Sequence, residues 1–117
     1  MYDIHCHILP GTDDGSPSFE ESLKMAADAI KNGTVGIICT SHVNSDSPYD
    51  TMKLHTLKKE LSQLLSDAGM ELKLYSGQEI MVGDNYREIP SMLKSHKLLT
   101  LAHSGYVLVE FPLDTDY

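Results

Sequence analysis

The run Val35-Gly36-Ile37-Ile38-Cys39-Thr40 is apolar almost throughout and has the length of one strand. A strand without polar alternation is typical of a parallel sheet that is covered on both faces. Helical patterns flank this run on either side. Before it, Ser18 stands three residues ahead of Glu21, as in a capping box, and apolar residues then repeat at helical spacing up to Gly33. After it, residues 52–68 carry leucines along one helical face. We therefore expect an α/β fold.

Three more segments complete the pattern. Residues 3–8, 72–76 and 106–111 have the composition of strands, and residues 86–94 predict a short helix. Residues 41–50 are polar and predict a loop. Strands that alternate with helices indicate βαβ units and a parallel sheet, here of about four strands. A closed (β/α) barrel takes about 250 residues. The 117 residues thus predict a single domain over 1–117, either a small open α/β domain or the first half of a barrel.

Composition excludes several classes of protein. The chain has 9 Lys and Arg against 17 Asp and Glu, a formal net charge of −8, which argues against a nucleic-acid groove. No apolar run reaches the roughly 18 residues of a transmembrane helix, and the N-terminus lacks the pattern of a signal peptide. Two cysteines, Cys6 and Cys39, are too few for a disulfide scaffold. We expect a cytoplasmic protein that does not span a membrane.

Each expected strand delivers a histidine or a carboxylate near its C-terminal end. These residues are His5, His7, His42, Glu79 and Glu110. Parallel strands place their C-terminal ends at one face of the sheet, where the active sites of such folds lie. The sequence therefore predicts that these side chains gather at one site.

The residue types at this site are those that bind divalent metal ions. His5 and His7 point the same way from an extended strand, and two imidazoles side by side can hold one ion, while Cys6 points to the other side and packs as a small hydrophobe. Glu110 interrupts an apolar strand, and a buried charge needs a partner, either a metal ion or a lysine. Asp13 and Asp14 lie in the loop over the same end. A turn with helix-terminal charge is the alternative explanation for the two aspartates.

Other polar residues offer no competing chemistry. We interpret His55, His96 and His103 as surface residues. The chain has no GxSxG elbow and no GxxxxGK[ST] loop. No Arg or Lys follows Cys39 over the next residues, as a cysteine phosphatase would need to bind phosphate. We therefore expect neither cysteine to be catalytic.

Four motifs resemble a known family. Asp3-Ile4-His5-Cys6-His7-Ile8-Leu9-Pro10-Gly11-Thr12-Asp13-Asp14-Gly15 resembles the opening of the PHP (polymerase and histidinol phosphatase) superfamily. Its Asp-Asp-Gly form is similar to the capsule-type, CpsB-like bacterial protein-tyrosine phosphatases. Thr40-Ser41-His42, Gly77-Gln78-Glu79-Ile80 and the segment 106–112 resemble the later motifs of that family, in order.

The resemblance implies a fold and a ligand set. The fold would be the N-terminal half of a distorted (β/α)7 PHP barrel, with a cluster of up to three divalent ions at its C-terminal face. His5 and His7 would bind one ion, Glu79 would bridge it to a second ion that Glu110 also binds, and Asp14 and His42 would serve a third. Asp13 is the alternative to Asp14. Manganese is the expected metal, with iron or zinc as alternatives.

The same resemblance implies a function. The family hydrolyses phosphotyrosine on a bacterial tyrosine kinase tail that regulates capsule or exopolysaccharide synthesis, with water activated by the bound ions. Another PHP hydrolase, such as a histidinol-phosphate phosphatase, is the alternative. The family's remaining His and Asp ligands would follow Tyr117, and Val43 stands where a second histidine is common. A catalytically incomplete fragment without turnover is therefore a further alternative, and an open sheet edge predicts self-association.

Overall fold

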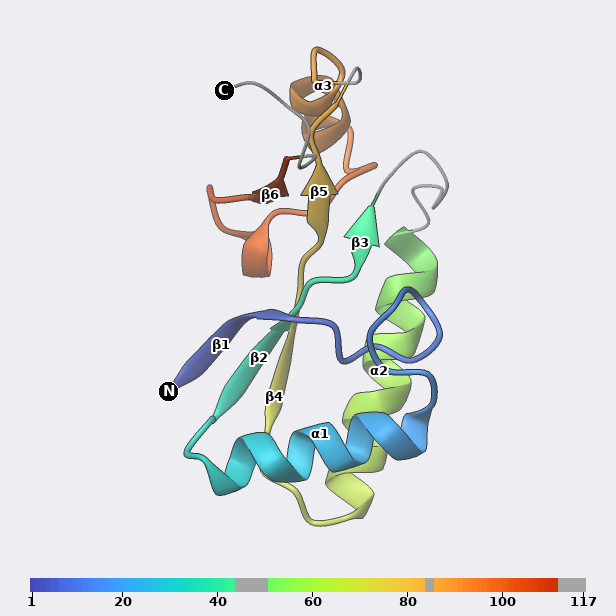
Figure 1. Cartoon of the computed structure of the whole chain (residues 1–117), viewed down its shortest axis with the longest axis vertical. Coiled ribbons are helices and arrows are strands. Elements are labelled where there is room, and N and C mark those ends of the chain that lie inside the picture. Colours follow the sequence, from blue (N-terminus) through green and yellow to red (C-terminus); the bar gives the residue numbers. More distant parts are fainter. Residues whose placement is uncertain (44–50, 84–85, 112–117) are drawn as a thin grey trace.

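The computed structural model describes residues 1–43, 51–83 and 86–111. Most of the predicted loop 41–50 lies outside these residues, as does Pro112 of the fourth motif. The described chain forms an elongated body in which two small sheets lie one above the other (Figure 1).

Both sheets are parallel and three-stranded. The first has the order β1-β2-β4, formed by Tyr2–Cys6, Gly36–Cys39 and Lys73–Ser76. The second has the order β3-β5-β6, formed by His42–Val43, Glu79–Met81 and Leu108–Glu110. The prediction of parallel strands alternating with helices is confirmed.

The prediction of four strands is wrong in number, because a short additional strand follows each of the expected strands 35–40 and 72–76: β3, within the predicted loop 41–50, and β5. Only Thr40 and Ser41 separate β2 from β3, and only Gly77 and Gln78 separate β4 from β5. At both breaks side chains bind backbone groups from elsewhere: the Thr40 hydroxyl binds β1, and the Gln78 side chain accepts a hydrogen bond from the Leu99 N–H. The four chain paths nevertheless lie side by side in sequence order, since β1 pairs with β2, β2 with β4, β3 with β5, and β5 with β6.

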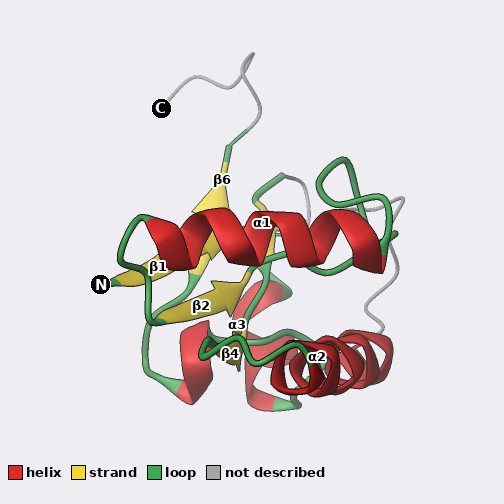
Figure 2. Cartoon of the chain, turned by 90° about the horizontal axis from the view of Figure 1, so that it is seen from below, coloured by secondary structure: helices red, strands yellow, loops and turns green. Residues whose placement is uncertain are grey.

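Two helices cover the first sheet. Helix α1, Phe19–Lys31, begins after Ser18, whose hydroxyl accepts a hydrogen bond from the Glu21 N–H at 3.2 Å as predicted. The Glu21 carboxylate pairs with Lys24 at 3.3 Å. Helix α2, Thr51–Asp67, packs beside β4. Figure 2 shows α1 lengthwise and α2 nearly end-on, so the two helix axes are strongly inclined to each other.

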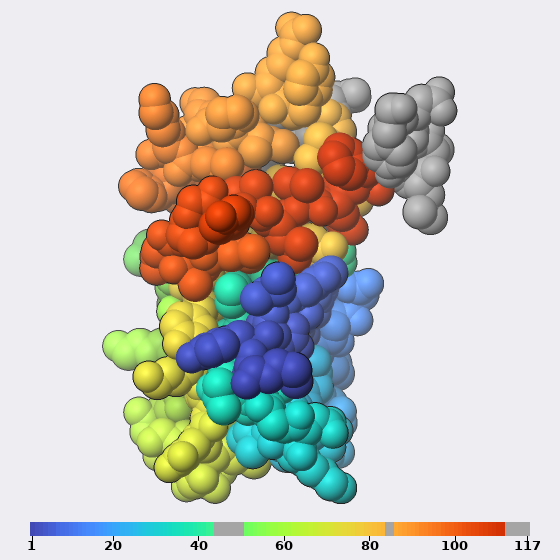
Figure 3. Space-filling view, turned by 90° about the vertical axis from the view of Figure 1, so that its left-hand side faces the viewer, coloured from blue at the N-terminus to red at the C-terminus, as the bar shows by residue number. Residues whose placement is uncertain are grey.

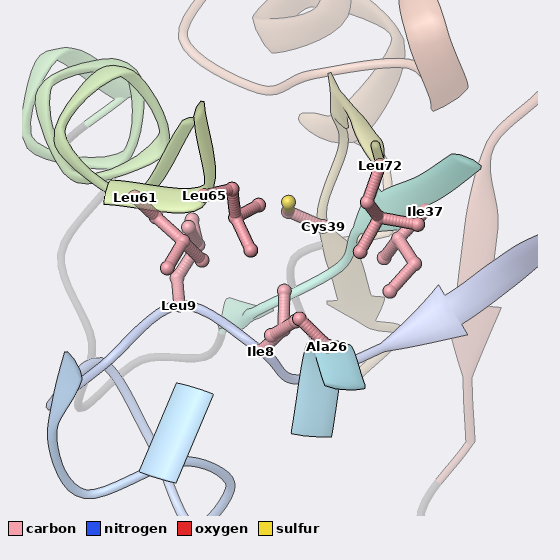
Figure 4. Close-up of a cluster of buried hydrophobic side chains, with 8 residues drawn as sticks. All are labelled: Ile8, Leu9, Ala26, Ile37, Cys39, Leu61, Leu65 and Leu72. Atoms are coloured by element: carbon pink, nitrogen blue, oxygen red, sulfur yellow. The ribbon is translucent and has the colours of Figure 1, made fainter. Parts of the chain in front are cut away.

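The main core lies between these helices and the first sheet (Figure 4). Its buried members are Ile8, Leu9, Ala26, Ile37, Cys39, Leu61, Leu65 and Leu72. Cys6 packs against this cluster, on the side of β1 that the predicted alternation gives it. A smaller cluster of Val43, Ile80, Ile89 and Leu98 supports the second sheet.

Short helical segments follow β5. Helix α3, Ile89–Lys94, occupies the last two thirds of the predicted helix 86–94, and Pro90 stands in its first turn, where the missing N–H costs nothing. The 3-10 turn Leu101–His103 then packs on β4 and leads toward β6.

Candidate metal centre

The six predicted ligands converge where the two sheets meet. His5 belongs to β1 and His7 follows it, while His42 and Glu79 begin β3 and β5 and are paired with each other in the ladder. Glu110 ends β6. Asp14 reaches the same place from the loop after β1, together with Asp13. Residues far apart in the sequence thus form one cluster.

Glu79 lies at the centre of this cluster. Its Oε2 atom is 2.8 Å from His7 Nε2, 3.2 Å from His5 Nε2 and 3.3 Å from His42 Nδ1. The Glu79 side chain is only 8% exposed, yet no described group gives this oxygen a hydrogen bond of acceptable geometry. Three imidazoles therefore crowd one buried oxygen without satisfying it.

The contacts around Glu79 also bring hydrogen-bond acceptors close to one another. The Nε2 atoms of His5 and His7 are 3.3 Å apart, so at most one of them can carry a proton in that contact. Glu110 Oε1 lies 2.9 Å from His42 Nδ1, which makes a histidine, and no lysine, its partner among the described residues. Lone pairs that face one another across a buried space are the arrangement expected around a cation.

Three overlapping groups have the donor set of a metal site. In each, one donor atom per residue lies within 4.8 Å of the others. The groups are His5, His7 and Glu79; His42, Glu79 and Glu110; and His7, Asp13, Asp14 and His42. Mixed imidazole and carboxylate donors suit manganese, iron or zinc, so the residues fit the kind of ion that the sequence predicts.

The two aspartates differ sharply in environment. Asp14 is 82% exposed, and its Oδ1 lies 3.5 Å from His42 Nε2 and 3.7 Å from His7 Nδ1. Asp13 is 5% exposed, and its Oδ2 lies 3.0 Å from His7 Nδ1. Asp13 also accepts hydrogen bonds from the backbone N–H groups of His42 and Gly15, both at 2.9 Å.

The loop after β1 is folded back onto His7. The Ser16 N–H donates to the His7 carbonyl at 3.0 Å, and the Gly11 N–H donates to the Ser16 carbonyl at 2.9 Å. A Cβ atom on Gly15 would collide with the Cβ and carbonyl oxygen of His7, so only glycine fits there. This close approach brings both aspartates of the Asp-Asp-Gly motif beside His7.

Thr40 fixes the strand that carries the first two histidines, a role that sequence reasoning missed. Its hydroxyl accepts a hydrogen bond from the Cys6 N–H at 2.9 Å, and its own N–H donates to the Cys6 carbonyl at 2.9 Å. The register of β1 against β2 shifts just before Cys6. The signal was present in the motif Thr40-Ser41-His42, but nothing local showed that the hydroxyl faces β1.

The remaining histidines lie outside the cluster. His96 and His103 are exposed, as predicted. His55 is partly buried where the prediction placed it on the surface: its Nδ1 lies 3.3 Å from Ser76 Oγ, which also accepts a hydrogen bond from Lys58 Nζ at 2.9 Å. Burial, together with Lys58 and His103, lowers the pKa of His55.

Neither thiol is activated. Burial raises the pKa of Cys6 to about 11 and that of Cys39 to about 12, so both are protonated at neutral pH. This agrees with the prediction that neither cysteine is catalytic. None of the helices in the described ranges is long and apolar enough to span a membrane.

The parallel α/β fold gathers three histidines and four carboxylates in one cluster. These features place the chain among α/β proteins with a candidate metal centre. A sequence model of the family described as "Capsular polysaccharide synthesis, CpsB/CapC" matches residues 1–117. The chain belongs to the CpsB/CapC family, which confirms the resemblance noted from its motifs.

Two similar proteins are both named tyrosine-protein phosphatases. The tyrosine-protein phosphatase YwqE of Bacillus subtilis is 36% identical over 115 residues, which cover 97% of this chain and 44% of YwqE. The tyrosine-protein phosphatase CpsB of Streptococcus pneumoniae is 32% identical over 123 residues, covering 100% of this chain and 47% of that protein.

The fold is also that of a solved structure. It is described as YwqE from Bacillus subtilis and CpsB from Streptococcus pneumoniae, "unique metal-dependent tyrosine phosphatases". The similarity has a TM-score of 0.91 at 34% identity and covers 100% of this chain and 47% of the other. The chain thus spans about half the length of the relatives that it matches.

Proposed function

We propose that this chain supplies the first part of a metal-dependent protein-tyrosine phosphatase. The observation that carries the proposal is the convergence of three imidazole nitrogens on the buried, unsatisfied Glu79 Oε2 atom. A site built only for stability would have given that oxygen a proper donor. The description of related proteins as metal-dependent tyrosine phosphatases supports the same reading.

The proposed ligands are assigned by their neighbours. His5 and His7 would hold one ion together with Glu79, and Glu79 and Glu110 would hold a second. Asp14 and His42 would serve a third, and manganese is the proposed metal, with iron or zinc as alternatives. Divalent ions at this site would supply neutralisation of phosphoryl charge and a lowered pKa of water.

The charge of the bare cluster explains why such ions are needed. Four carboxylates line the site, and the chain carries a net charge of −8 with one arginine, Arg87. A phosphate dianion would be repelled from this surface unless the carboxylates were neutralised. The His5 side chain is 50% exposed, which leaves one side of the cluster open to a phosphotyrosyl side chain.

We also propose that residues 1–117 form the N-terminal half of a distorted (β/α)7 PHP barrel within one domain. The four chain paths follow each other in sequence order with all pairings parallel, which is the order of a barrel wall. The rest of such a barrel would add the remaining His and Asp ligands. The proposed substrate is a phosphotyrosyl protein, a bacterial tyrosine kinase that regulates capsule synthesis, in the cytoplasm.

A chimera tests this proposal, with this chain in place of the matching region of the Bacillus subtilis YwqE. We expect manganese-stimulated, chelator-sensitive release of phosphate from a phosphotyrosyl peptide. Glu79→Gln should abolish the release, whereas His96→Asn, at an exposed histidine with positive φ, should keep it. A folded chimera with no metal-dependent activity would contradict the proposal. If the chimera preferred histidinol phosphate to the phosphotyrosyl peptide, a histidinol-phosphate phosphatase would be the better assignment.

A further inference from the structure

Asp13 is placed differently from the neighbouring acid of its loop. Its side chain is buried, and both carboxylate oxygens are already used by the protein: Oδ1 accepts from the Gly15 N–H, and Oδ2 accepts from the His42 N–H. Asp14, by contrast, is largely exposed, and its Oδ1 atom faces the imidazole rings of His7 and His42.

A carboxylate whose two oxygens each accept a backbone N–H is held in one orientation by the protein. Turning Oδ2 away toward an ion would leave the part-buried His42 N–H without its acceptor, and such an unsatisfied donor is costly. The exposed Asp14 carboxylate can turn toward an ion at no such cost.

The position of Asp13 also acts on the rings of the cluster. Its Oδ2 is 3.0 Å from His7 Nδ1, and this negative charge favours a proton on that nitrogen. The lone pair of His7 then belongs to Nε2, which faces Glu79 and His5. A carboxylate behind a metal-binding imidazole fixes the orientation of the ring in this way.

We propose that Asp13 is a positioning residue that ties His7 to His42 and thereby sets the spacing of the metal cluster. One oxygen of Asp13 joins the two histidines, since it lies beside the His7 ring and accepts from the His42 backbone. The inference deepens the proposed function and rests on it for the identity of the ligand as a divalent ion.

The test compares Asp13→Asn with its neighbour Asp14→Asn in the whole chain. The first measurement, on metal-free protein, is hydrogen exchange at the amide of His42. Asp13→Asn should expose this amide to faster exchange because one acceptor oxygen becomes an NH2 group, and Asp14→Asn should leave the exchange unchanged. Unchanged exchange in Asp13→Asn would overturn the positioning role.

The second measurement is titration with Mn²⁺ and with Co²⁺, whose absorption bands report the geometry of its ligands. Asp13→Asn should weaken binding by about 10- to 100-fold and alter the Co²⁺ spectrum at an unchanged number of ions. Asp14→Asn should bind fewer ions. Loss of an ion in Asp13→Asn but not in Asp14→Asn would show that Asp13 is the ligand and overturn the assignment.

The two proposals fail in distinguishable ways. If the unsubstituted chain binds no ion at all, the proposed function fails, and the exchange of the His42 amide alone decides whether Asp13 holds β3. Far-UV circular dichroism and the urea midpoint of each variant confirm that the compared proteins are folded.

Discussion

The chemistry of single side chains in this protein depends on the groups that surround them once they are buried. Glu79 and Cys39 are both buried, yet one lies among imidazoles and the other among leucines. The Glu79 carboxylate therefore lies where a cation would be stabilised, whereas the Cys39 thiol is an inert part of the core. His7 and Asp13 form a third case, in which the burial of one acid sets the orientation of a neighbouring ring.

Cys39 should be unreactive in the folded chain. Its pKa is raised to about 12, chiefly by burial and further by Cys6, with Lys58 acting in the opposite direction. Because the thiolate is the nucleophile, we expect iodoacetamide at about pH 7.5 to leave Cys39 unmodified until urea unfolds the protein. Mass spectrometry of the intact protein measures this. Equal rates of alkylation with and without urea would contradict the inert role of this thiol.

The same shift has a consequence for stability at high pH. The thiol of the unfolded chain loses its proton near the ordinary cysteine pKa of 9.0, while the folded thiol keeps its proton to about pH 12. The unfolded state then binds fewer protons, so the free energy of unfolding should fall as pH rises through this window.

Thr40→Val should destabilise the chain and loosen its metal site. The substitution keeps the shape of the side chain but removes the hydroxyl that accepts the Cys6 N–H, which we expect to cost about 1–3 kcal/mol of unfolding free energy. Since His5 and His7 flank Cys6, metal affinity should fall as well. Thr40→Ser retains the hydroxyl and is the control. Urea unfolding and a Mn²⁺ titration of both variants test this, and equal behaviour of the two would refute it.

At the scale of helices and strands, local patterns predicted the helices better than the strand ends. The capping residue Ser18 and the leucine periodicity locate α1 and α2 almost to the residue. The short strands β3 and β5 were not predicted, because bonds over long sequence distances hold the residues that precede them. One is the contact of Thr40 with Cys6, and another is the bond from Leu99 to Gln78.

The candidate site was predictable as far as strand ends determine it, but not where loop folding determines it. The rule that parallel strands end on one face brings His5, His42 and Glu79 together without knowledge of the structure. The rule does not say which aspartate of the loop is buried, since that depends on the way residues 8–16 fold back over His7. Helical periodicity did not show that His55 meets Ser76, because one turn of α2 faces β4 through polar atoms.

The lowered pKa of His55 should make stability depend on pH. Burial, Lys58 and His103 lower the pKa of His55 in the folded chain. Between this lowered value and the ordinary value of 6.5, the unfolded state binds more protons, so the free energy of unfolding should fall as pH drops below about 6.5. Urea unfolding at several pH values should show a weaker decline in His55→Gln than in the unsubstituted chain. A decline of the same size in both would contradict this role for His55.

At the scale of the whole molecule, the four chain paths form a wall with two open edges. Strand β1 is an edge strand of the first sheet and β6 is an edge strand of the second, and Figure 3 shows the blue N-terminal strand directly below the orange and red residues that lead into β6. Tyr2, Ile4 and Val109 are exposed apolar residues on these edge strands. Unpaired backbone groups next to apolar side chains are the features that promote strand pairing between molecules.

We therefore predict that this chain self-associates through its open edges. Gel filtration with light scattering should give a mass above that of the monomer at high protein concentration, and more so at high salt, which screens the repulsion of a net charge of −8. Ile4→Lys, on β1, should reduce association. Val35→Lys is the control, because Val35 is 49% exposed, close to the 56% of Ile4, but precedes β2 and lies on no edge strand. A monomer under all conditions would exclude this interface.

The clustered histidines and carboxylates should hold divalent ions, and the function proposed for the chain depends on this. The most direct measurement is the metal content of the chain after purification and loading with manganese, by elemental mass spectrometry. We predict two or more ions per chain, with Glu79→Gln reducing the number and His96→Asn leaving it unchanged. A folded chain that binds no manganese, iron or zinc would contradict the assignment of a metal centre.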